Sequence, residues 1–184
     1  MLSPNNERPE QAASVLAHDH SEIDTLIRDL MAALEEGDKP KAFAGLDLLW
    51  ARLAVHIRAE HLCLFPSVLE ATFTSTRGGP QYQEALSAID QLRVDHEFFM
   101  RELGTSVNSM RNQEGTSDQE VVSKHLREVR RSIVEMQSRL AKHNQLEENH
   151  VYKWVDVLLD EAKRAKLATR IRRELENIPL RFRF

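Results

Sequence analysis

Two similar sets of histidine and carboxylate side chains are spaced along this chain of 184 residues. Each set is an Asp-His pair followed, after a long gap, by His-x-x-x-Glu. The two sets are Asp19-His20 with His56 and Glu60, and Asp95-His96 with His143 and Glu147. Imidazole nitrogens and carboxylate oxygens are ligands that suit iron, manganese or zinc. The pattern therefore predicts a site for two metal ions, whose ligands are His20, His56, Glu60, His96, His143 and Glu147.

Helices must bring these residues together, and helical patterning runs through most of the chain. Apolar residues recur at helical spacing, and no stretch alternates as a β-strand would. The expected helices are about 9–36, 38–72, 81–111 and 117–160, with a further helix to about 177. Four long helices joined by short loops predict an all-α fold. We expect an up-down-up-down four-helix bundle over residues 1–160 and an extra C-terminal helix in the segment 161–184.

Local signals predict several of the helix ends. Gly37 should end the first helix, because glycine readily adopts the left-handed conformation found there. Pro66 must kink or terminate the second helix, because its ring clashes with the carbonyl four residues earlier. The Gly- and Ser-containing segment 74–80 is an expected loop. Ser117-x-x-Glu120 is typical of a capping box and should open the fourth helix.

The predicted ligands should lie on the inward faces of these helices and at one level. Each of them continues an apolar stripe of i, i+3, i+4, i+7 spacing. In an antiparallel hairpin, residues equidistant from the turn lie at the same depth. The midpoint of His20 and His56 is position 38, and that of His56 and His96 is position 76, both in predicted turns. The midpoint of His96 and His143 falls just past the third predicted loop.

Charge burial favours a metal at such a site. Burying a carboxylate in apolar surroundings is costly unless it is paired or binds metal. No lysine lies on the stripes near Glu60 or Glu147. The nearest cations are Arg52 and Arg93, which can pair with these carboxylates. A buried hydrogen-bonded network without metal is the alternative, and metal is the simpler compensation.

The predicted ligand set leaves room for an external ligand. If both glutamates bridge the two ions, each ion has two imidazoles and two carboxylate oxygens. A bridging oxo or hydroxo group would then leave one position open on each ion. A purely structural metal normally has a closed shell. Open positions on a buried metal pair suit the binding of dioxygen, peroxide or nitric oxide.

Two segments resemble the signature of a known family. HIRAEHLCLFP, residues 56–66, is similar to the His-x-x-x-Glu-Glu-x-x-Leu-Phe-Pro signature of hemerythrin-like proteins, the HHE cation-binding family. HNQLEENHVYKW, residues 143–154, resembles a second copy, and the Asp-His pairs match the family's histidines on two further helices. The resemblance covers residues 14–160. It implies that the four histidines are terminal iron ligands and that Glu60 and Glu147 bridge a non-haem di-iron centre.

The chain also departs from that family. Oxygen-carrying hemerythrins have a fifth histidine where this chain has Leu92, which argues against reversible oxygen transport. His61 replaces the second glutamate of the signature and is expected beside the site or on the surface, with an additional metal ligand as the alternative. His150, seven residues after His143, is either a fifth histidine ligand, a proton donor or a packed residue. Cys63 holds the corresponding place after His56 and is either a redox-sensing thiol or a small buried hydrophobe.

Other residues near the predicted ligands have simpler expected roles. Asp19 and Asp95 either orient neighbouring groups or lie on a solvated face. His18 and His125 lie off the apolar stripes and are expected on the surface. The aromatic residues that are expected to do no more than pack are Tyr152, Trp50 and Trp154.

The leading functional hypothesis is a di-iron protein that binds dioxygen, nitric oxide or peroxide, for sensing or for iron and redox homeostasis. The same open positions would serve a peroxidase, an oxidase or a nitric oxide reductase, so the ligands alone do not decide whether the protein is an enzyme. A ferritin-like iron oxidase needs two Glu-x-x-His motifs, and this chain offers one, Glu147-x-x-His150. A metal-free helical interaction module is a fourth hypothesis.

Composition limits the compartment and the partners. Residues 161–184 carry eight Lys or Arg against three Glu, so this segment is +5 and residues 1–160 are −9 in a chain of net charge −4. The basic segment can dock on an acidic protein partner or membrane surface, or it can pack back on the acidic body. The body offers no basic face for nucleic acid. No apolar run is long enough to span a membrane, and neither a signal peptide nor a disulfide framework is expected, which predicts a cytoplasmic protein.

Overall fold

The computed structural model describes residues 11–75, 78–112 and 119–182, and every regular element in these ranges is helical. This confirms the predicted all-α class. The four long helices are α1 (Ala12–Glu36), α2 (Lys39–Ala59), α4 (Tyr82–Asn112) and α5 (Gln119–Leu146). The shorter elements are the π-helical turns η1 (Glu60–Leu64) and η2 (Glu147–Val151), the helices α3 (Phe65–Thr74), α6 (Tyr152–Leu158) and α7 (Glu161–Glu176), and the 3₁₀ turn η3 (Leu180–Phe182).

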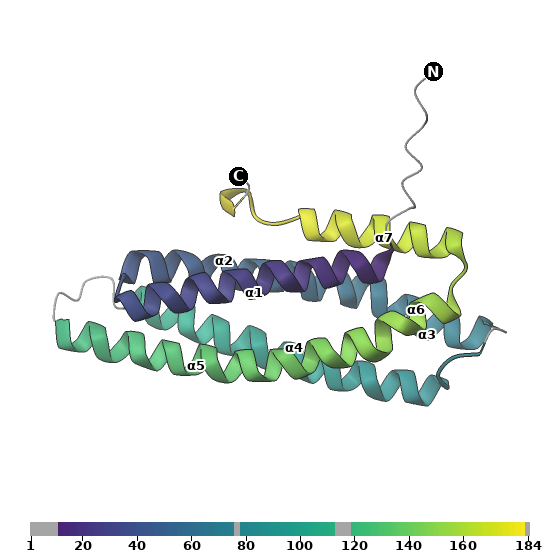
Figure 1. Cartoon of the computed structure of the whole chain (residues 1–184), viewed down its shortest axis with the longest axis horizontal. Coiled ribbons are helices and arrows are strands. Elements are labelled where there is room, and N and C mark those ends of the chain that lie inside the picture. The colour runs from purple at the N-terminus through teal and green to yellow at the C-terminus, as the bar shows by residue number, and fades with distance from the viewer. Residues whose placement is uncertain (1–10, 76–77, 113–118, 183–184) are drawn as a thin grey trace, which may run out of the picture.

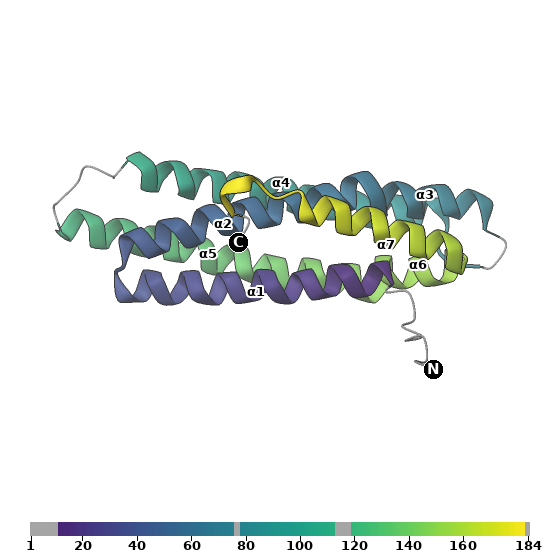
Figure 2. The same cartoon turned by 90° about the horizontal axis from the view of Figure 1, so that it is seen from above.

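The four long helices lie side by side around one interior (Figures 1 and 2). α1 packs against α2 and α5, and α4 packs against the same two helices. Their apolar faces form two separate clusters of buried side chains. On α1, Leu16 belongs to one cluster and Ile23 to the other, and His20 lies between them. The interior is therefore apolar towards both ends and polar at the level of the predicted ligands.

The connection between α1 and α2 follows its local sequence closely. Gly37 adopts φ 72°, and its N–H bonds the carbonyl of Ala33, so the predicted glycine stop is confirmed. The Asp38 side chain then accepts from the backbone N–H of Lys41 and caps α2. This tight turn makes α1 and α2 antiparallel neighbours.

Pro66 does not terminate the second helix. The chain continues as α3 to Thr74, two residues beyond the predicted end, after the single π-helical turn η1. In this turn the N–H of Phe65 bonds the carbonyl of Glu60, five residues back. Pro66 has no N–H to offer to the carbonyl of Leu62, and that carbonyl instead accepts from Arg170 at 3.1 Å. The C-terminal helix thus satisfies the backbone group that the proline leaves free.

A second π turn interrupts the fourth long helix, although no proline is present there. η2 begins at Glu147, and the N–H of Tyr152 bonds the Glu147 carbonyl. α6 then ends at Leu158, two residues before the predicted end at Asp160, and the backbone of Leu159 is extended. Ser117 of the capping box expected at the start of this helix lies outside the described residues.

The C-terminal helix α7 packs across α1 and α2 (Figure 2). Its apolar face buries Leu167, Ile171 and Leu175. Ion pairs add to this contact, with Glu174 on Arg58 at 2.8 Å and Arg181 on Asp47 at 3.1 Å. The basic segment therefore lies against the acidic body, the second of the two arrangements expected from its charge.

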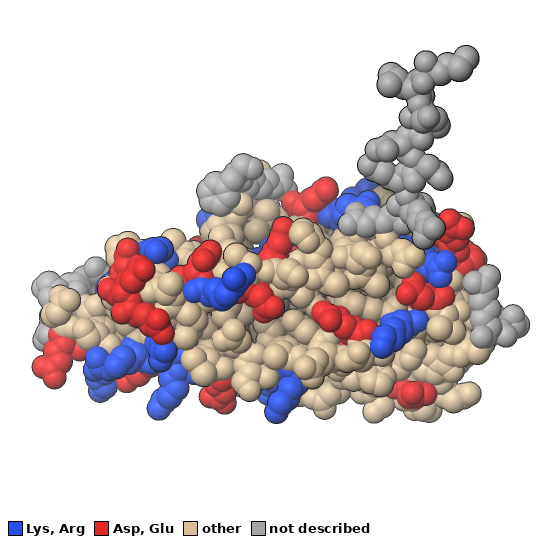
Figure 3. All heavy atoms as spheres, viewed as in Figure 1, with Lys and Arg blue, Asp and Glu red and all other residues tan. Residues whose placement is uncertain are grey.

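The surface carries charges of both signs. Figure 3 shows acidic and basic side chains interspersed on one face of the molecule. Of the helices in the described ranges, none has the length and apolar character that crossing a membrane requires.

Candidate metal centre

The six predicted ligands meet at the polar level of the interior. They come from all four long helices and both π turns, as His20 on α1, His56 on α2, His96 on α4, His143 on α5, Glu60 on η1 and Glu147 on η2. All six are buried, and none exposes more than 4% of its surface. Both glutamates are the first residues of their π turns, so each stands at a point where helical register changes.

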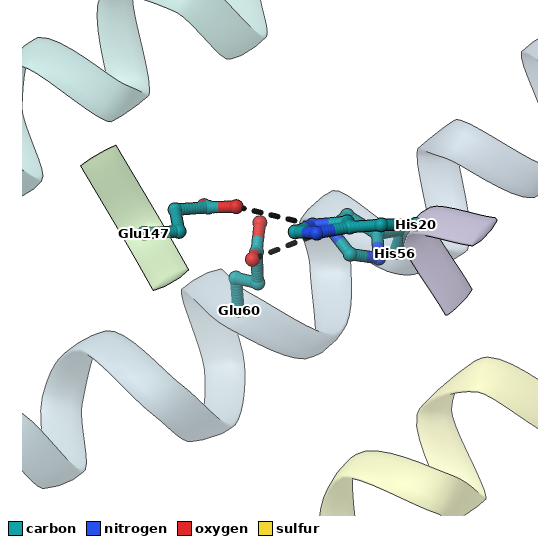
Figure 4. Close-up of side chains that lie close together, drawn as sticks. All are labelled: His20, His56, Glu60 and Glu147. Carbon is teal, nitrogen blue, oxygen red and sulfur yellow. Dashed lines mark ion pairs between the residues drawn. The ribbon is translucent and has the colours of Figure 1, made fainter. Parts of the chain in front are cut away.

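These side chains form two overlapping groups of four. The first group is His20, His56, Glu60 and Glu147, and the second group is Glu60, His96, His143 and Glu147. Within each group, one candidate ligand atom from every residue lies within 4.8 Å of the others. Figure 4 shows the first group, in which both imidazoles point towards the two carboxylates. Each group could hold one metal ion.

The shared glutamates present one oxygen to each group. Oε1 of Glu60 lies 3.3 Å from Nε2 of His56, and Oε2 lies 3.2 Å from Nε2 of His96. Oε2 of Glu147 lies 3.2 Å from Nε2 of His20, and Oε1 lies 3.2 Å from Nε2 of His143. This is the arrangement that two bridging carboxylates require.

Each imidazole turns its Nε2 inwards because its Nδ1 has a partner on the outer side. Asp19 lies 2.7 Å from Nδ1 of His56, and Glu148 lies 2.9 Å from Nδ1 of His20. In the second group, Asp95 lies 3.4 Å from Nδ1 of His143, and Nε2 of His61 lies 2.9 Å from Nδ1 of His96. Such partners fix the ring orientation and the tautomer of a metal-binding histidine.

The two aspartates therefore orient their neighbours, and the expectation of a solvated face is wrong. Asp19 is 1% exposed and Asp95 is 7% exposed. Each is also paired with an arginine, Asp19 with Arg52 and Asp95 with Arg139 at 2.7 Å. These arginines offset the charge of the outer aspartates.

Among the described residues, no arginine pairs with either shared glutamate. Arg52 binds Asp19 and Glu22, and Arg93 binds Asp90 at 3.1 Å. The sequence leaves open that these two arginines pair with Glu60 or Glu147. In the described part of the chain they do not. The cationic groups that do contact the glutamates are imidazoles, when these are protonated.

The pKa values of the metal-free site follow from this packing. Burial lowers the pKa of His56, but Glu60 and Asp19 outweigh it and hold that pKa well above the ordinary 6.5. Burial also lowers the pKa of His143, but Glu147 outweighs it, so this pKa is raised as well. Burial raises the pKa of Glu60, whereas His56 and His96 hold it well below 4.5. These shifts favour protonated imidazoles beside ionised carboxylates, whereas metal binding requires the imidazoles to be neutral.

The residues present fit a metal pair. Oε2 of Glu60 and Oε1 of Glu147 are buried and have no hydrogen-bond partner, although each lies 3.2 Å from an imidazole nitrogen. Nε2 of His96 also lies 3.0 Å from Nε2 of His143, an arrangement in which only one ring nitrogen can donate. Buried carboxylate oxygens without a hydrogen-bond partner suit a cation, and nitrogen with carboxylate oxygen suits iron, manganese or zinc.

Tyr152 is a site residue that sequence reasoning assigned only to packing. Its hydroxyl lies 3.2 Å from Nε2 of His20, 3.4 Å from Oε1 of Glu60 and 3.3 Å from Oε2 of Glu147. Burial, Glu147 and Glu60 raise its pKa well above 10, so the phenol stays protonated and donates. A π turn places residue i+5 on the face of residue i. The feature of the sequence that could have indicated this role is a tyrosine five residues after Glu147.

The same π turn removes His150 from the site. A regular helix would place His150 on the face of His143, but the extra residue in η2 rotates it outwards. His150 is exposed and contacts Trp154, with ring centroids 6.0 Å apart. Its proposed roles as a fifth ligand or a proton donor are therefore not supported by its position.

The structure also places four residues whose position the sequence leaves open or predicts to be on the surface. His61 is half-buried and contacts His96, so it lies beside the site and not on the open surface. Cys63 is 3% exposed, and burial raises the pKa of its thiol, which favours the small-hydrophobe interpretation. His18 is on the surface as expected, but His125 is buried near Ser109, so its predicted exposure is wrong.

A polar groove reaches the first group from outside. It lies between α1 and α5, has a volume of about 580 Å³, and His20 and Glu148 are among its lining residues. Ser21, Asp24 and Gln145 are among its other lining residues. The groove gives small polar species a path to the outer edge of His20.

Comparison with known proteins adds no assignment. No family model, no curated protein and no solved structure matches this chain. Any functional conclusion therefore rests on the residues and their geometry.

Proposed function

We propose that this chain is a hemerythrin-like four-helix-bundle protein that holds two iron ions and binds dioxygen, nitric oxide or peroxide, for sensing or for iron and redox homeostasis. The observation that carries the proposal is the pair of four-residue groups that share Glu60 and Glu147. A single metal site would need neither the second pair of histidines nor two carboxylates with one oxygen directed to each group. The resemblance of residues 56–66 and 143–154 to hemerythrin-like segments supports iron in preference to manganese or zinc.

Iron, when bound, would supply open coordination positions and a change of oxidation state. The chain's own residues perform the holding and orienting. The histidines present Nε2 to the interior, and their outer partners keep Nδ1 protonated and the rings aligned. The two apolar clusters on either side limit the access of bulk water.

Tyr152 favours a second candidate, a di-iron oxidoreductase acting on peroxide or nitric oxide. A buried phenol in contact with both shared carboxylates is placed to donate a hydrogen bond or a proton to a ligand between them. Catalytic consumption of peroxide or nitric oxide, with an added reductant, would distinguish this candidate from the binding protein.

A ferritin-like iron oxidase and a metal-free protein have less support. A ferritin-like site would need His150 to project inwards with Glu147, but His150 is exposed. A metal-free interaction module acting through the basic segment would need that segment to be available, whereas α7 is packed on α1 and α2. A metal-free hydrogen-bonded network would leave one buried oxygen of Glu60 and one of Glu147 without a partner.

The experiment that tests the proposal is metal analysis of the full chain expressed with iron, combined with absorption spectra in air and without it. We expect two irons per chain and a near-ultraviolet band that bleaches on reduction and returns in air. Glu60→Gln should abolish the paired site, and His18→Ala, a change at an exposed histidine of α1, should leave it intact. A folded chain that binds no metal would overturn the proposal.

A further inference from the structure

The two groups of ligands are related by an internal repeat, yet their outer partners differ. The repeat aligns HIRAEHLCLF, residues 56–65, with HNQLEENHVY, residues 143–152. Within it, His61 corresponds to Glu148, and each lies one residue after a shared glutamate. Glu148 contacts Nδ1 of His20 on a neighbouring helix, and His61 contacts Nδ1 of His96 in the same way, both at 2.9 Å. The repeat thus places an imidazole where its other copy has a carboxylate.

This exchange changes the charge next to the histidines. In the first group both imidazoles have carboxylate partners, Asp19 on His56 and Glu148 on His20. In the second group only His143 has one, Asp95, and the contact is longer, 3.4 Å against the 2.7 Å of Asp19. One arginine accompanies each aspartate, so the arginines do not remove the difference.

A second pair of corresponding residues differs in the same direction. Tyr152 and Phe65 each follow a shared glutamate by five residues and stack on an imidazole with ring centroids 5.9 Å apart. Tyr152 brings a hydroxyl to His20 in the first group, whereas Phe65 brings only an apolar ring to His96 in the second. The surroundings of the first group are therefore more polar and more negative.

We propose that the two metal positions are unequal, that the first group binds a divalent cation before the second, and that His61 is the positioning residue that makes the second group weaker. This rests on the proposed function only in so far as both groups hold metal. A carboxylate that accepts from Nδ1 raises the basicity of Nε2, and a neutral imidazole acceptor does so less. Loss of such a partner typically lowers metal affinity by about 10- to 100-fold.

Unequal positions have a consequence for the way the protein works. Over the range of cation concentration between the two dissociation constants, the chain holds one ion in the first group and none in the second. A centre that needs both ions is then assembled only when the cation is abundant. The loading of the second group would report metal availability.

The test is a titration of the metal-free full chain with Co²⁺, followed by calorimetry and by the visible absorption of bound Co²⁺. We expect two steps whose dissociation constants differ by about tenfold or more. His143→Ala, which damages the second group, should keep the tight step. His56→Ala, which damages the first group, should remove it.

Exchanging the outer residues tests the role of His61 directly. His61→Glu makes the two copies alike, and we expect the weak step to tighten by about tenfold while the tight step is unchanged. The matched control is His18→Glu, the same change at an exposed histidine, which should leave both steps as they were. The reciprocal Glu148→His, at a side chain that is half exposed, should loosen the tight step until the two steps merge.

Several results would overturn this inference. Two equal Co²⁺ sites in the unaltered chain would do so, as would a tight step lost in His143→Ala and kept in His56→Ala. Circular dichroism shows whether His61→Glu folds, and Glu148→His tests the same difference if it does not. A folded chain that binds no Co²⁺ and no iron would overturn the proposed function as well, whereas two equal sites leave that function standing.

Discussion

The hydroxyl of Tyr152 lies 3.3 Å from Oε2 of Glu147, a residue five positions earlier in the chain. Residues five apart in a regular α-helix point about 140° away from each other, so this contact depends on the π turn η2. The turn η1 likewise spans Glu60 and Phe65, and Phe65 stacks on His96. The two π turns therefore decide which side chains complete the surroundings of the shared carboxylates.

Removing the hydroxyl should weaken the metal-free protein. We expect Tyr152→Phe to lower the free energy of unfolding by about 1–3 kcal/mol, because the buried oxygens of Glu60 and Glu147 lose a donor. Urea unfolding of the metal-free chain measures this. Tyr82→Phe, at a tyrosine outside the site, is the control, and an equal loss in both variants would contradict the role given to Tyr152.

The outer aspartate of the first group should control its metal affinity. Asp19→Asn removes the anionic partner of His56 while keeping the size of the side chain, and we expect about 10- to 100-fold weaker binding of the first ion. Calorimetry with Co²⁺ measures the change. Asp29→Asn, at an exposed aspartate of the same helix, should have no effect. Unchanged affinity in Asp19→Asn would show that this contact does not support the ligand.

The shifted pKa values of His56 and Glu60 predict how the stability of the metal-free chain depends on pH. The pKa of His56 is raised above 6.5, so its contribution to metal-free stability is fully present below 6.5 and is lost as pH rises through the folded value. The pKa of Glu60 is depressed below 4.5, so its contribution is present above 4.5 and is lost as pH falls through the folded value. These two groups therefore stabilise the metal-free chain most between about 4.5 and 6.5.

Metal binding requires neutral imidazoles and so gains from higher pH. We expect the difference in Tm between the loaded and the metal-free chain to widen from about pH 6 to about pH 8. Thermal melts of both forms across this range measure it. A constant difference would mean that the metal displaces no protons from His56 and His143.

Cys63 should be unreactive in the folded protein. Its side chain is buried, and burial raises the pKa of the thiol, so little thiolate is exposed to attack. We expect a thiol reagent such as a soluble aromatic disulfide to react slowly with the native chain and with one thiol per chain in urea. Rapid native reaction would restore the redox-sensor interpretation.

The sequence by itself determined the helical class, the glycine stop at Gly37 and the set of six side chains that the interior brings together. These depend on local rules, because a period of 3.6 residues fixes which residues share a helix face, and glycine alone readily adopts φ 72°. The antiparallel connection of α1 and α2 then sets His20 and His56 at one depth, as their equal distance from the turn predicted.

Only the tertiary structure decided what surrounds those six residues. The π turns shift the register by one residue, and so exchange His150 for Tyr152 at the site. Contacts between residues far apart in the chain, such as Glu148 with His20 and Arg170 with the Leu62 carbonyl, follow from how helices pack and leave no periodic trace in the sequence. The two groups of candidate ligands differ in such outer contacts, Glu148 on His20 in the first and His61 on His96 in the second, because the ligand residues themselves are of the same types.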